Sequence, residues 1–211
     1  KYKEPRKLPS TIPTNILTGL FRSLYSALDD AKTDYARKAA ARDVAVVELL
    51  FATGMRISEL CSLKPEQLDM EGKAVRIWGK GAKERIIPLE NQDVLNALAY
   101  YISLHEEQIR AGGCLFVNNR GRQYSDQSAR NMIRRHKDAC HISMRIVPHM
   151  FRHTFATSFV DADVDIRVIQ TLMGHSSIKT TEIYTDVSTA KKRTVIANKH
   201  LRNSFHPKAA G

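Results

Sequence analysis

Six side chains spread along the chain are of the types that phosphoryl-transfer chemistry requires. They comprise two arginines, a lysine, two histidines and a tyrosine, namely Arg56, Lys80, His149, Arg152, His175 and Tyr184. A phenol, whose ordinary pKa is about 10, can attack phosphorus when a neighbouring group accepts its proton. Fixed guanidinium groups stabilise the negative charge that collects on the non-bridging oxygens in the transition state. Such a set could carry out transesterification at a phosphodiester without a metal.

The remaining members of this set could move protons. A leaving sugar oxygen needs a proton, which a hairpin lysine such as Lys80 can donate. His149 and His175 titrate near neutral pH, one as an acid or base and the other as a hydrogen-bond donor. A covalent tyrosyl phosphate conserves the bond energy, so rejoining the strand would need no nucleotide cofactor. We therefore expect no cofactor, and breaking and rejoining is favoured over simple hydrolysis.

Each of these residues, taken alone, also has a simpler explanation. His175, which follows a glycine, is often a helix cap in such a place, and a lone tyrosine such as Tyr184 is usually a half-buried packing residue. Arg56, with Glu59 three positions later on one helical face, is either a solvated arginine in a local ion pair or a guanidinium held rigid for phosphate. The GKGAKER turn, with Lys80 and Lys83 at its tip, is either a flexible basic turn or a basic finger for a DNA groove. A complete set of partners for one reaction favours the catalytic interpretations.

A metal site is the alternative for the histidines of the HMFRHTFAT segment. His149 and His153 have the spacing of the HExxH ligands, but the general-base glutamate is absent and Arg152 beside them would repel a cation. We therefore expect no metal, and place His153 in a supporting position on the helical face of His149 and Arg152. The opposite face carries three phenylalanines that would anchor the helix, Phe151, Phe155 and Phe159.

The elements that must hold these residues are mostly helices. Apolar spacing predicts helices over 14–28, 41–53, 56–63, 94–109, 149–160, 165–173, 178–184 and 189–200, and one that Ser125 caps. Two short β-branched runs, 74–78 and 84–89, flank the glycine-containing turn and predict a β-hairpin, which a strand near 67–70 could join. The expected fold is mainly α (α+β), with a small antiparallel three-stranded sheet.

Composition limits the class of partner. The chain has 211 residues and a net charge of +11, which favours a polyanionic partner but does not separate DNA from RNA. It contains no apolar run of about 18 residues, so a membrane span is disfavoured. Its three cysteines are scattered and odd in number, which disfavours a disulfide framework and favours a reducing cytoplasm.

Four motifs resemble those of the tyrosine recombinases, the phage-integrase family, and in particular its Xer-like and transposon-integrase branch. They are ATGMRISEL, GKGAKERIIPL, PHMFRHTFAT and LMGHSSIKTTEIY, in the family's order over about residues 40–187. The resemblance implies the helical catalytic domain of DNA breaking-rejoining enzymes. It also implies roles for the six residues: Arg56 and Arg152 as phosphate clamps, Lys80 as general acid, His149 and His175 as the histidines of the site, and Tyr184 as the nucleophile that becomes a 3′-phosphotyrosine. Departures at Met150, Phe151 and Met173 are similar in volume to the common residues.

The resemblance also implies an organisation and partners. Residues 1–13 would be the remnant of a linker from an N-terminal core-binding domain, 14–187 the catalytic domain, and 188–211 a C-terminal segment with an inter-subunit helix. The expected partners are double-stranded DNA, a homo- or hetero-tetramer assembled on two DNA sites, and optionally an accessory protein. Charge, rather than the resemblance, predicts further DNA contacts at five basic residues, Lys83, Arg76, Arg130, Arg134 and Arg135. Arg130 and Arg134 are four positions apart and share a helix face, which either reads the DNA or is simply solvated.

Two other functions share part of this pattern. A type IB topoisomerase uses the same chemistry, but the hairpin and the tyrosine region match recombinases, and no coiled-coil linker precedes Tyr184. A non-catalytic DNA-binding module of the same fold would be expected to have lost some of the six residues, whereas all are present.

Overall fold

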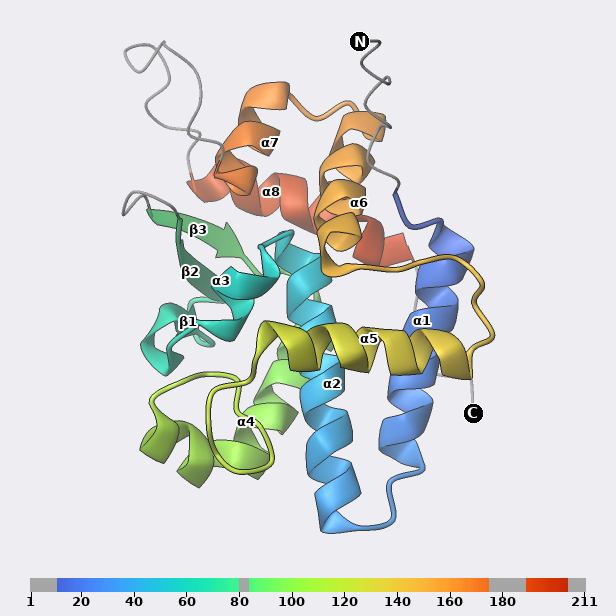
Figure 1. Cartoon of the computed structure of the whole chain (residues 1–211). Coiled ribbons are helices and arrows are strands. Elements are labelled where there is room, and N and C mark those ends of the chain that lie inside the picture. The colour runs from blue at the N-terminus through green and yellow to red at the C-terminus, as the bar shows by residue number, and fades with distance from the viewer. Residues whose placement is uncertain (1–10, 80–83, 175–188, 205–211) are drawn as a thin grey trace, which may run out of the picture.

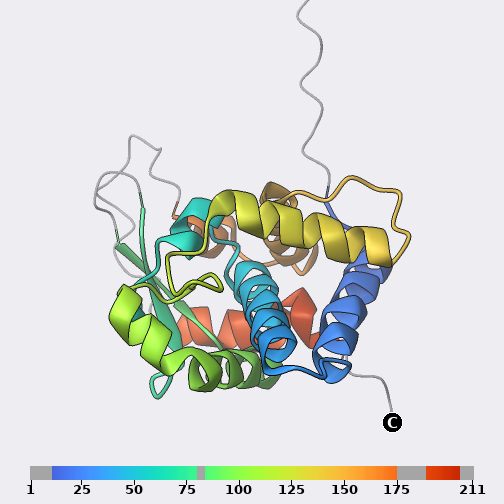
Figure 2. The same cartoon turned by 60° about the horizontal axis from the view of Figure 1, so that its bottom comes forward.

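Helix α2 (Asp34–Thr53) runs through the middle of the molecule, and four longer helices pack around it. The computed structural model describes residues 11–79, 84–174 and 189–204. These longer helices, as Figures 1 and 2 show, are α1 (Thr14–Asp29), α4 (Gln92–Gly112), α5 (Asp126–Ala139) and α6 (Pro148–Asp161), and the short helix that follows α2 contacts it too. Every residue of α2 from Ala40 to Thr53 is buried, so this helix is core on all sides.

Capping residues set the two ends of α2. The Thr33 side chain accepts a hydrogen bond from the first-turn backbone at 3.1 Å, and Gly54 ends the helix with a φ of +57°. A Cβ at Gly54 would lie 2.7 Å from the ring of Phe155, so both conformation and packing require glycine here. The helix begins at Asp34 rather than at the predicted 41, because its first residues lack the apolar spacing on which that prediction rested.

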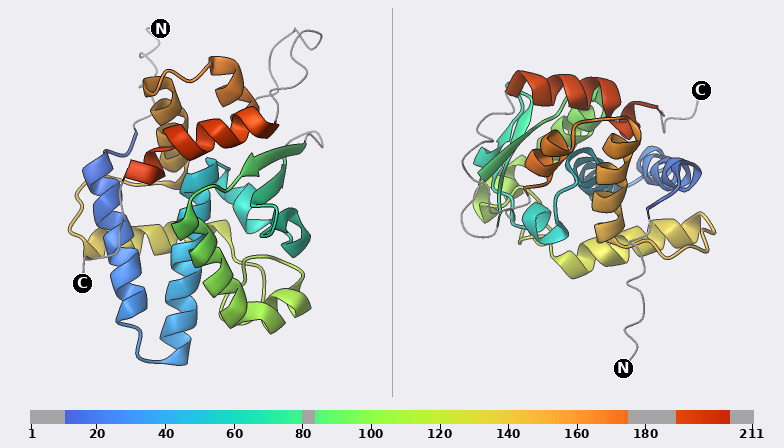
Figure 3. Two further views of the ribbon diagram at one scale, coloured as in Figure 1. Left: turned by 180° about the vertical axis from the view of Figure 1, so that it is seen from behind. Right: turned by 90° about the horizontal axis from the view of Figure 1, so that it is seen from above.

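The remaining helical segments are short. They are α3 (Ile57–Cys61), α7 (Ile166–Met173), α8 (Thr189–Lys199) and the 3₁₀ turns η1 (Pro65–Gln67) and η2 (Leu201–Ser204). The predicted helices at 56–63, 165–173 and 189–200 are thereby confirmed, whereas the one at 178–184 lies outside the described residues. Figure 3 shows α8 and α5 on opposite faces of the molecule, with α2 and α6 between them.

A small sheet lies beside the helices. Its strands β1 (Leu68–Asp69), β2 (Ala74–Trp78) and β3 (Glu84–Pro88) are antiparallel in the order β1-β2-β3. In β2 and β3 the register pairs Val75 with Ile87, and both side chains are buried. The mainly α fold with a three-stranded antiparallel sheet is confirmed, and the turn at 80–83 lies outside the described residues.

A second apolar cluster joins α6, α7 and α8. Its buried members are Phe155, Phe159, Val168, Ile169, Leu172, Met173 and Ile196. The predicted anchoring of α6 by its phenylalanines is confirmed, since all three are fully buried. The segment before α1 is held to α6 as well, because Ile12 is buried and its N–H donates to the Thr154 hydroxyl at 2.8 Å.

A fully buried ion pair attaches η2 to α2. The Arg202 guanidinium donates to both carboxylate oxygens of Glu48, at 2.9 and 2.7 Å, and to Asp93 at 3.3 Å. The Tyr25 hydroxyl donates to the same Glu48 carboxylate at 2.7 Å. The charges of Glu48 and Arg202 are therefore satisfied by each other rather than by water, and the chain that follows α8 is fixed on the central helix.

We expect Arg202→Met to lower the free energy of unfolding by about 3–5 kcal/mol, because it leaves the Glu48 carboxylate buried without its countercharge. Urea unfolding followed by circular dichroism measures the difference. The control is Lys38→Met, which removes an exposed pair with Asp34 at 3.2 Å and should cost at most about 0.5 kcal/mol. Equal losses in the two variants would contradict this prediction.

Candidate active site

Arg152 lies where the C-terminal ends of two helices meet. It is 3% exposed, and its guanidinium donates to the carbonyl oxygens of Gly54 at the end of α2 (2.8 Å) and of Met173 at the end of α7 (2.7 Å). The negative ends of both helix dipoles therefore stabilise its positive charge. The buried phenylalanine face of α6 fixes the rotation of the helix, so this guanidinium has a defined place and orientation.

Arg56 precedes α3 and is tied to Glu59 in the first turn of that helix. The Glu59 carboxylate accepts hydrogen bonds from the Arg56 backbone N–H at 2.8 Å and from the Arg56 guanidinium at 2.9 Å. The Glu59 side chain is 8% exposed, whereas the Arg56 side chain is 44% exposed. The ion pair predicted from the sequence is confirmed, and it holds a guanidinium that a ligand can reach.

A further arginine, Arg85 on β3, binds the same carboxylate. Its two terminal nitrogens donate to Glu59 Oε1 at 3.2 Å and to Oε2 at 2.6 Å. Arg85 also packs against Gly174, where φ is +63° and a Cβ would lie 2.9 Å from Arg85 Cδ. This side chain therefore joins α3 to the end of α7.

These residues form a cluster with three positive charges and one negative charge. Burial, together with the positive charges of Arg56 and Arg85, lowers the pKa of Arg152 to about 10. Burial would raise the pKa of Glu59, but hydrogen bonds from Arg85 and Arg56 hold it below its ordinary value. The carboxylate is thus ionised at neutral pH and compensates only part of the positive charge. An anion such as a phosphodiester would supply the rest.

The two histidines of α6 lie beside this cluster. The rings of His149 and His153 are perpendicular, with their centroids 4.9 Å apart. His149 is exposed, whereas His153 is half-buried. Burial, followed by the positive charges of His149 and Arg152, lowers the pKa of His153. At neutral pH His153 is therefore mostly uncharged, and it lies near both the exposed His149 and the buried Arg152 on α6.

Four predicted site residues lie outside the described residues, namely Lys80, Lys83, His175 and Tyr184. The described chain stops at Gly79 and at Gly174, immediately before Lys80 and His175. The elements that precede His175 and follow Lys83, α7 and β3, contact each other. The structure thus brings Arg56, Glu59, His149, Arg152 and His153 together, and the positions of the other four stay predictions.

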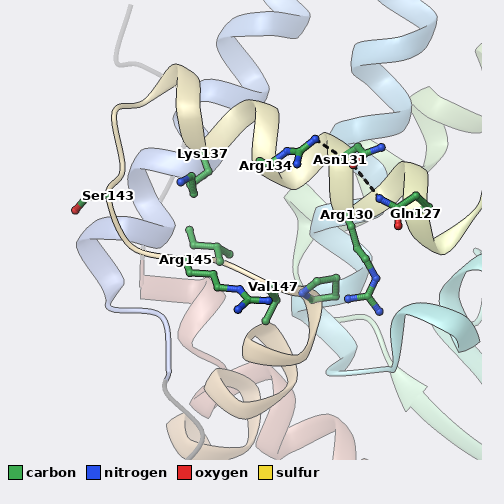
Figure 4. Close-up of a pocket in the computed structure, with 10 residues that line it drawn as sticks. Gln127, Arg130, Asn131, Arg134, Lys137, Ser143, Arg145 and Val147 are labelled. Atoms are coloured by element: carbon green, nitrogen blue, oxygen red, sulfur yellow. Dashed lines mark hydrogen bonds between the residues drawn. The ribbon is translucent and has the colours of Figure 1, made fainter.

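A basic groove of about 360 Å³ runs between α5 and residues 143–148 (Figure 4). Four of its lining side chains are basic, and none of the described residues that line it is acidic: the basic ones are Arg130, Arg134, Lys137 and Arg145. The prediction that Arg130 and Arg134 share one helix face is confirmed. Since α5 contacts α3, the groove lies on an element adjacent to Arg56.

The other two arginines predicted to contact DNA lie outside this groove. Arg76 faces outward on β2 and pairs with Glu84 at 2.8 Å. Arg135 pairs with the buried carboxylate of Asp43. Both arginine side chains are more than half exposed, so these pairs do not prevent contact with a ligand. Their role as DNA contacts stays a prediction.

Arg85 is the site residue that sequence reasoning missed. In the strand ERIIPL, Arg85 alternates with Ile86 and so shares its face with Ile87 and Leu89, both of which are buried. An arginine at an inward-facing position requires a buried acceptor, and this signal was available.

Two kinds of feature are absent from the described ranges, 11–79, 84–174 and 189–204. No helix there has the length and apolarity needed to cross a membrane. In the same ranges, no three His, Cys, Asp or Glu side chains lie close enough together to hold a metal ion.

Comparison with known sequences places the chain among recombinases. The sequence model described as the phage integrase family matches residues 21–191. A tyrosine recombinase of Agathobacter rectalis is 46% identical over 205 residues, which cover 97% of this chain and 67% of the relative. The tyrosine recombinase XerC of Corynebacterium glutamicum is 38% identical over 171 residues, which cover 80% of this chain and 52% of the relative. The chain thus spans about half to two thirds of the length of these relatives.

Solved structures share the fold. The crystal structure of XerA recombinase superposes with a TM-score of 0.68 at 30% identity, covering 90% of this chain and 65% of that chain. The XerH site-specific recombinase bound to difH substrate, in a pre-cleavage complex, gives a TM-score of 0.69 at 24% identity, covering 90% of this chain and 53% of that chain.

Proposed function

The chain belongs to the phage integrase family, and from this premise we propose that it is the catalytic part of a site-specific DNA recombinase. The proposed activity cleaves and rejoins DNA through a covalent 3′-phosphotyrosine at Tyr184. The observation that carries this proposal is the positive cluster around Glu59. It presents the exposed Arg56 and the fixed Arg152 to an anion that the described residues do not supply.

In the proposed reaction, the Tyr184 oxygen attacks the phosphorus atom while the bond to the 5′ oxygen breaks. A histidine of the site, His149 or His175, accepts the phenol proton, and Lys80 gives a proton to the leaving 5′ oxygen. Arg56 and Arg152 stabilise the charge on the non-bridging oxygens. In the reverse step a 5′ hydroxyl attacks the phosphotyrosine, so the strand is rejoined without a nucleotide cofactor.

The proposed partner is double-stranded DNA. The basic groove between α5 and residues 143–148 supports this, because four cations line it, of which Lys137 also pairs with Asp138 at 3.0 Å. Several structural relatives are described as bound to DNA, among them XerH with difH and the Tn1549 transposon integrase with transposon right-end DNA. One nucleophile per chain and four strands to exchange lead us to propose a homo- or hetero-tetramer on two DNA sites, with an accessory protein as an optional component.

The proposed domain organisation assigns 1–13 to a linker, 14–187 to the catalytic domain and 188–211 to a segment that contacts a neighbouring subunit. In the structure α8 packs on its own chain, through the buried Ile196 and through Arg193, which donates to Glu90 at 2.5 Å. An inter-subunit contact by this helix would therefore require either its exchange between subunits or a contact through its exposed residues Ala197, Asn198 and Lys199.

We expect the double variant Lys137→Gln/Arg145→Gln to bind DNA more weakly and with a smaller dependence on salt. Each phosphate contact that is lost should reduce the slope of log K against log salt by about 0.9. Fluorescence anisotropy at several salt concentrations measures this slope. Arg110→Gln, at an exposed position near the end of α4, is the control and should leave the slope unchanged. An unchanged slope in the double variant would show that the groove does not bind the backbone.

Trapping the covalent intermediate tests the proposed function. The intact protein is mixed with a pool of duplexes that carry a randomised site and a nick, so that a cleaved end diffuses away. We expect an adduct that resists detergent, forms in the presence of EDTA, and carries its DNA on the peptide that contains Tyr184. The DNA in the adducts should converge on one sequence.

Other outcomes decide against this proposal. Absence of any adduct, or an adduct on another residue, would overturn the assigned reaction. Adducts without sequence convergence, together with relaxation of supercoiled plasmid, would favour the topoisomerase alternative. Loss of the adduct in the presence of EDTA would favour a metal-dependent mechanism instead.

A further inference from the structure

Arg85 is a buried cation to which the proposed reaction assigns no role. Its side chain is 6% exposed, and the inward face of β3 on which it lies otherwise carries apolar residues such as Ile87. Burying a guanidinium is costly unless a carboxylate compensates it. Among the described residues that carboxylate is Glu59, so the two side chains must be considered together.

The hydrogen bonds around Glu59 show how Arg85 acts on Arg56. Glu59 Oε1 accepts from the guanidinium groups of both Arg56 and Arg85, and Oε2 accepts from the Arg56 backbone N–H and from Arg85. Four donors thus hold a carboxylate that is itself 8% exposed. Without Arg85, the same carboxylate would face Arg56 alone, and its position would no longer be fixed by the sheet.

The charge balance points the same way. Because Arg85 already neutralises Glu59, the positive charges of Arg56 and Arg152 stay available for an external anion. Without Arg85, the negative charge of Glu59 would be compensated mainly by Arg56. The carboxylate would then compete with a bound phosphate for the Arg56 guanidinium.

The contact with Gly174 extends this role to a second part of the site. The end of α7 rests on the Arg85 side chain, with no room for a Cβ between them. The carbonyl of Met173, just before this glycine, is one of the two acceptors that orient Arg152. One side chain therefore touches the supports of both candidate phosphate clamps.

We propose that Arg85 is a positioning residue for strand cleavage: it holds Glu59 in place and neutralises it, so that Arg56 and Arg152 both face the phosphate. This inference rests on the proposed function. Both terminal nitrogens of Arg85 donate to Glu59, so we propose that it acts through this carboxylate and not by contact with DNA. Its effect should therefore appear in the rate of the chemical step and not in DNA affinity.

The test measures the rate of adduct formation at saturating DNA, and separately the affinity for uncleaved DNA. We expect Arg85→Met to slow adduct formation by about 100-fold, comparable with the loss of one oxyanion-stabilising donor, while the dissociation constant changes less than about threefold. Glu59→Gln should cause a similar loss. Because Arg85 acts through Glu59, the double variant should be about as slow as either single variant, not slower by the product of both effects.

Arg42→Met is the matched control. Arg42 is as buried as Arg85 and likewise bonds to a buried carboxylate, that of Asp43 at 3.4 Å. It lies in the first half of α2, away from the end of the helix at Gly54 that supports Arg152. Its loss should lower stability yet leave adduct formation by the folded protein within about twofold of the wild type. If Arg85→Met does not fold, Arg85→Lys replaces it, because it keeps the positive charge but removes the two-pronged guanidinium. We expect Arg85→Lys to slow adduct formation by about tenfold. In a protein that already carries Glu59→Gln, the same substitution should cause no further loss of rate.

The outcomes separate this inference from the proposed function. If the wild type forms no adduct, the proposed function fails. If the wild type forms the adduct and the Arg85 variant forms it equally fast, only the role of Arg85 is overturned. Independent, multiplying effects of Arg85→Met and Glu59→Gln would also overturn it.

Discussion

Tyr184→Phe is expected to abolish the covalent adduct, with a loss of more than about 10³-fold, while DNA binding stays within about twofold of the wild type. The substitution removes one oxygen atom and keeps the ring, so the nucleophile is lost without a change in apolar volume. The detergent-resistant complex on a nicked duplex measures the first effect, and fluorescence anisotropy measures the second.

The structure disfavours several other tyrosines as the attacking nucleophile. Tyr25, Tyr101 and Tyr124 are buried, and burial raises the pKa of each, that of Tyr101 to about 12. A buried phenol of this kind neither reaches DNA nor ionises readily. Tyr35 is exposed but lies at the start of α2 and contacts Asn119, away from the positive cluster.

The matched control for this prediction is Tyr100→Phe. Tyr100 is a half-exposed tyrosine on α4, and its variant should form the adduct at the rate of the wild type. An adduct that persists in Tyr184→Phe, or one that disappears in Tyr100→Phe, would show that another residue attacks the phosphorus.

Arg152→Lys is expected to slow adduct formation by about 10³-fold, although it conserves the charge. The guanidinium reaches the carbonyls of Gly54 and Met173 at once and has further donors for a phosphate. A lysine side chain is shorter and ends in one ammonium nitrogen. It therefore cannot donate to both carbonyls and to a phosphate oxygen at the same time. Single-turnover cleavage at saturating DNA measures the loss.

Stability must be measured beside this rate, because two buried carbonyls lose their donors. A melting curve for Arg152→Lys shows whether enough folded protein is present to interpret the rate. Arg42→Lys serves as the control for shortening a buried arginine, and it should cleave at the wild-type rate. Cleavage by the folded Arg152→Lys protein within about tenfold of the wild type would show that charge alone, and not the fork, is what the site requires.

Much of the fold was accessible from local patterns. The strands 74–78 and 84–88, the helix after Ser125 and the end of α2 at Gly54 follow from alternation, capping and a glycine stop, which are properties of neighbouring residues. The beginning of α2 was not predicted, because its first two turns lack regular apolar spacing. The local signal for this end of the helix is the Thr33 cap, whose side chain accepts from the backbone of the first turn.

The sequence by itself determined which residue types are present for the reaction, in four motifs, and the pairing of Arg56 with Glu59 across one helical turn. Only the tertiary structure decided how Arg152 is held, because its acceptors are backbone carbonyls 98 and 21 positions away. A carbonyl is the same in every residue type and leaves no trace in a sequence. The structure likewise decided that Arg85, 26 positions from Glu59, shares its carboxylate, and that Arg202 and Glu48 meet across 154 positions. Such pairs depend on which elements pack together, and that is a property of the folded chain as a whole.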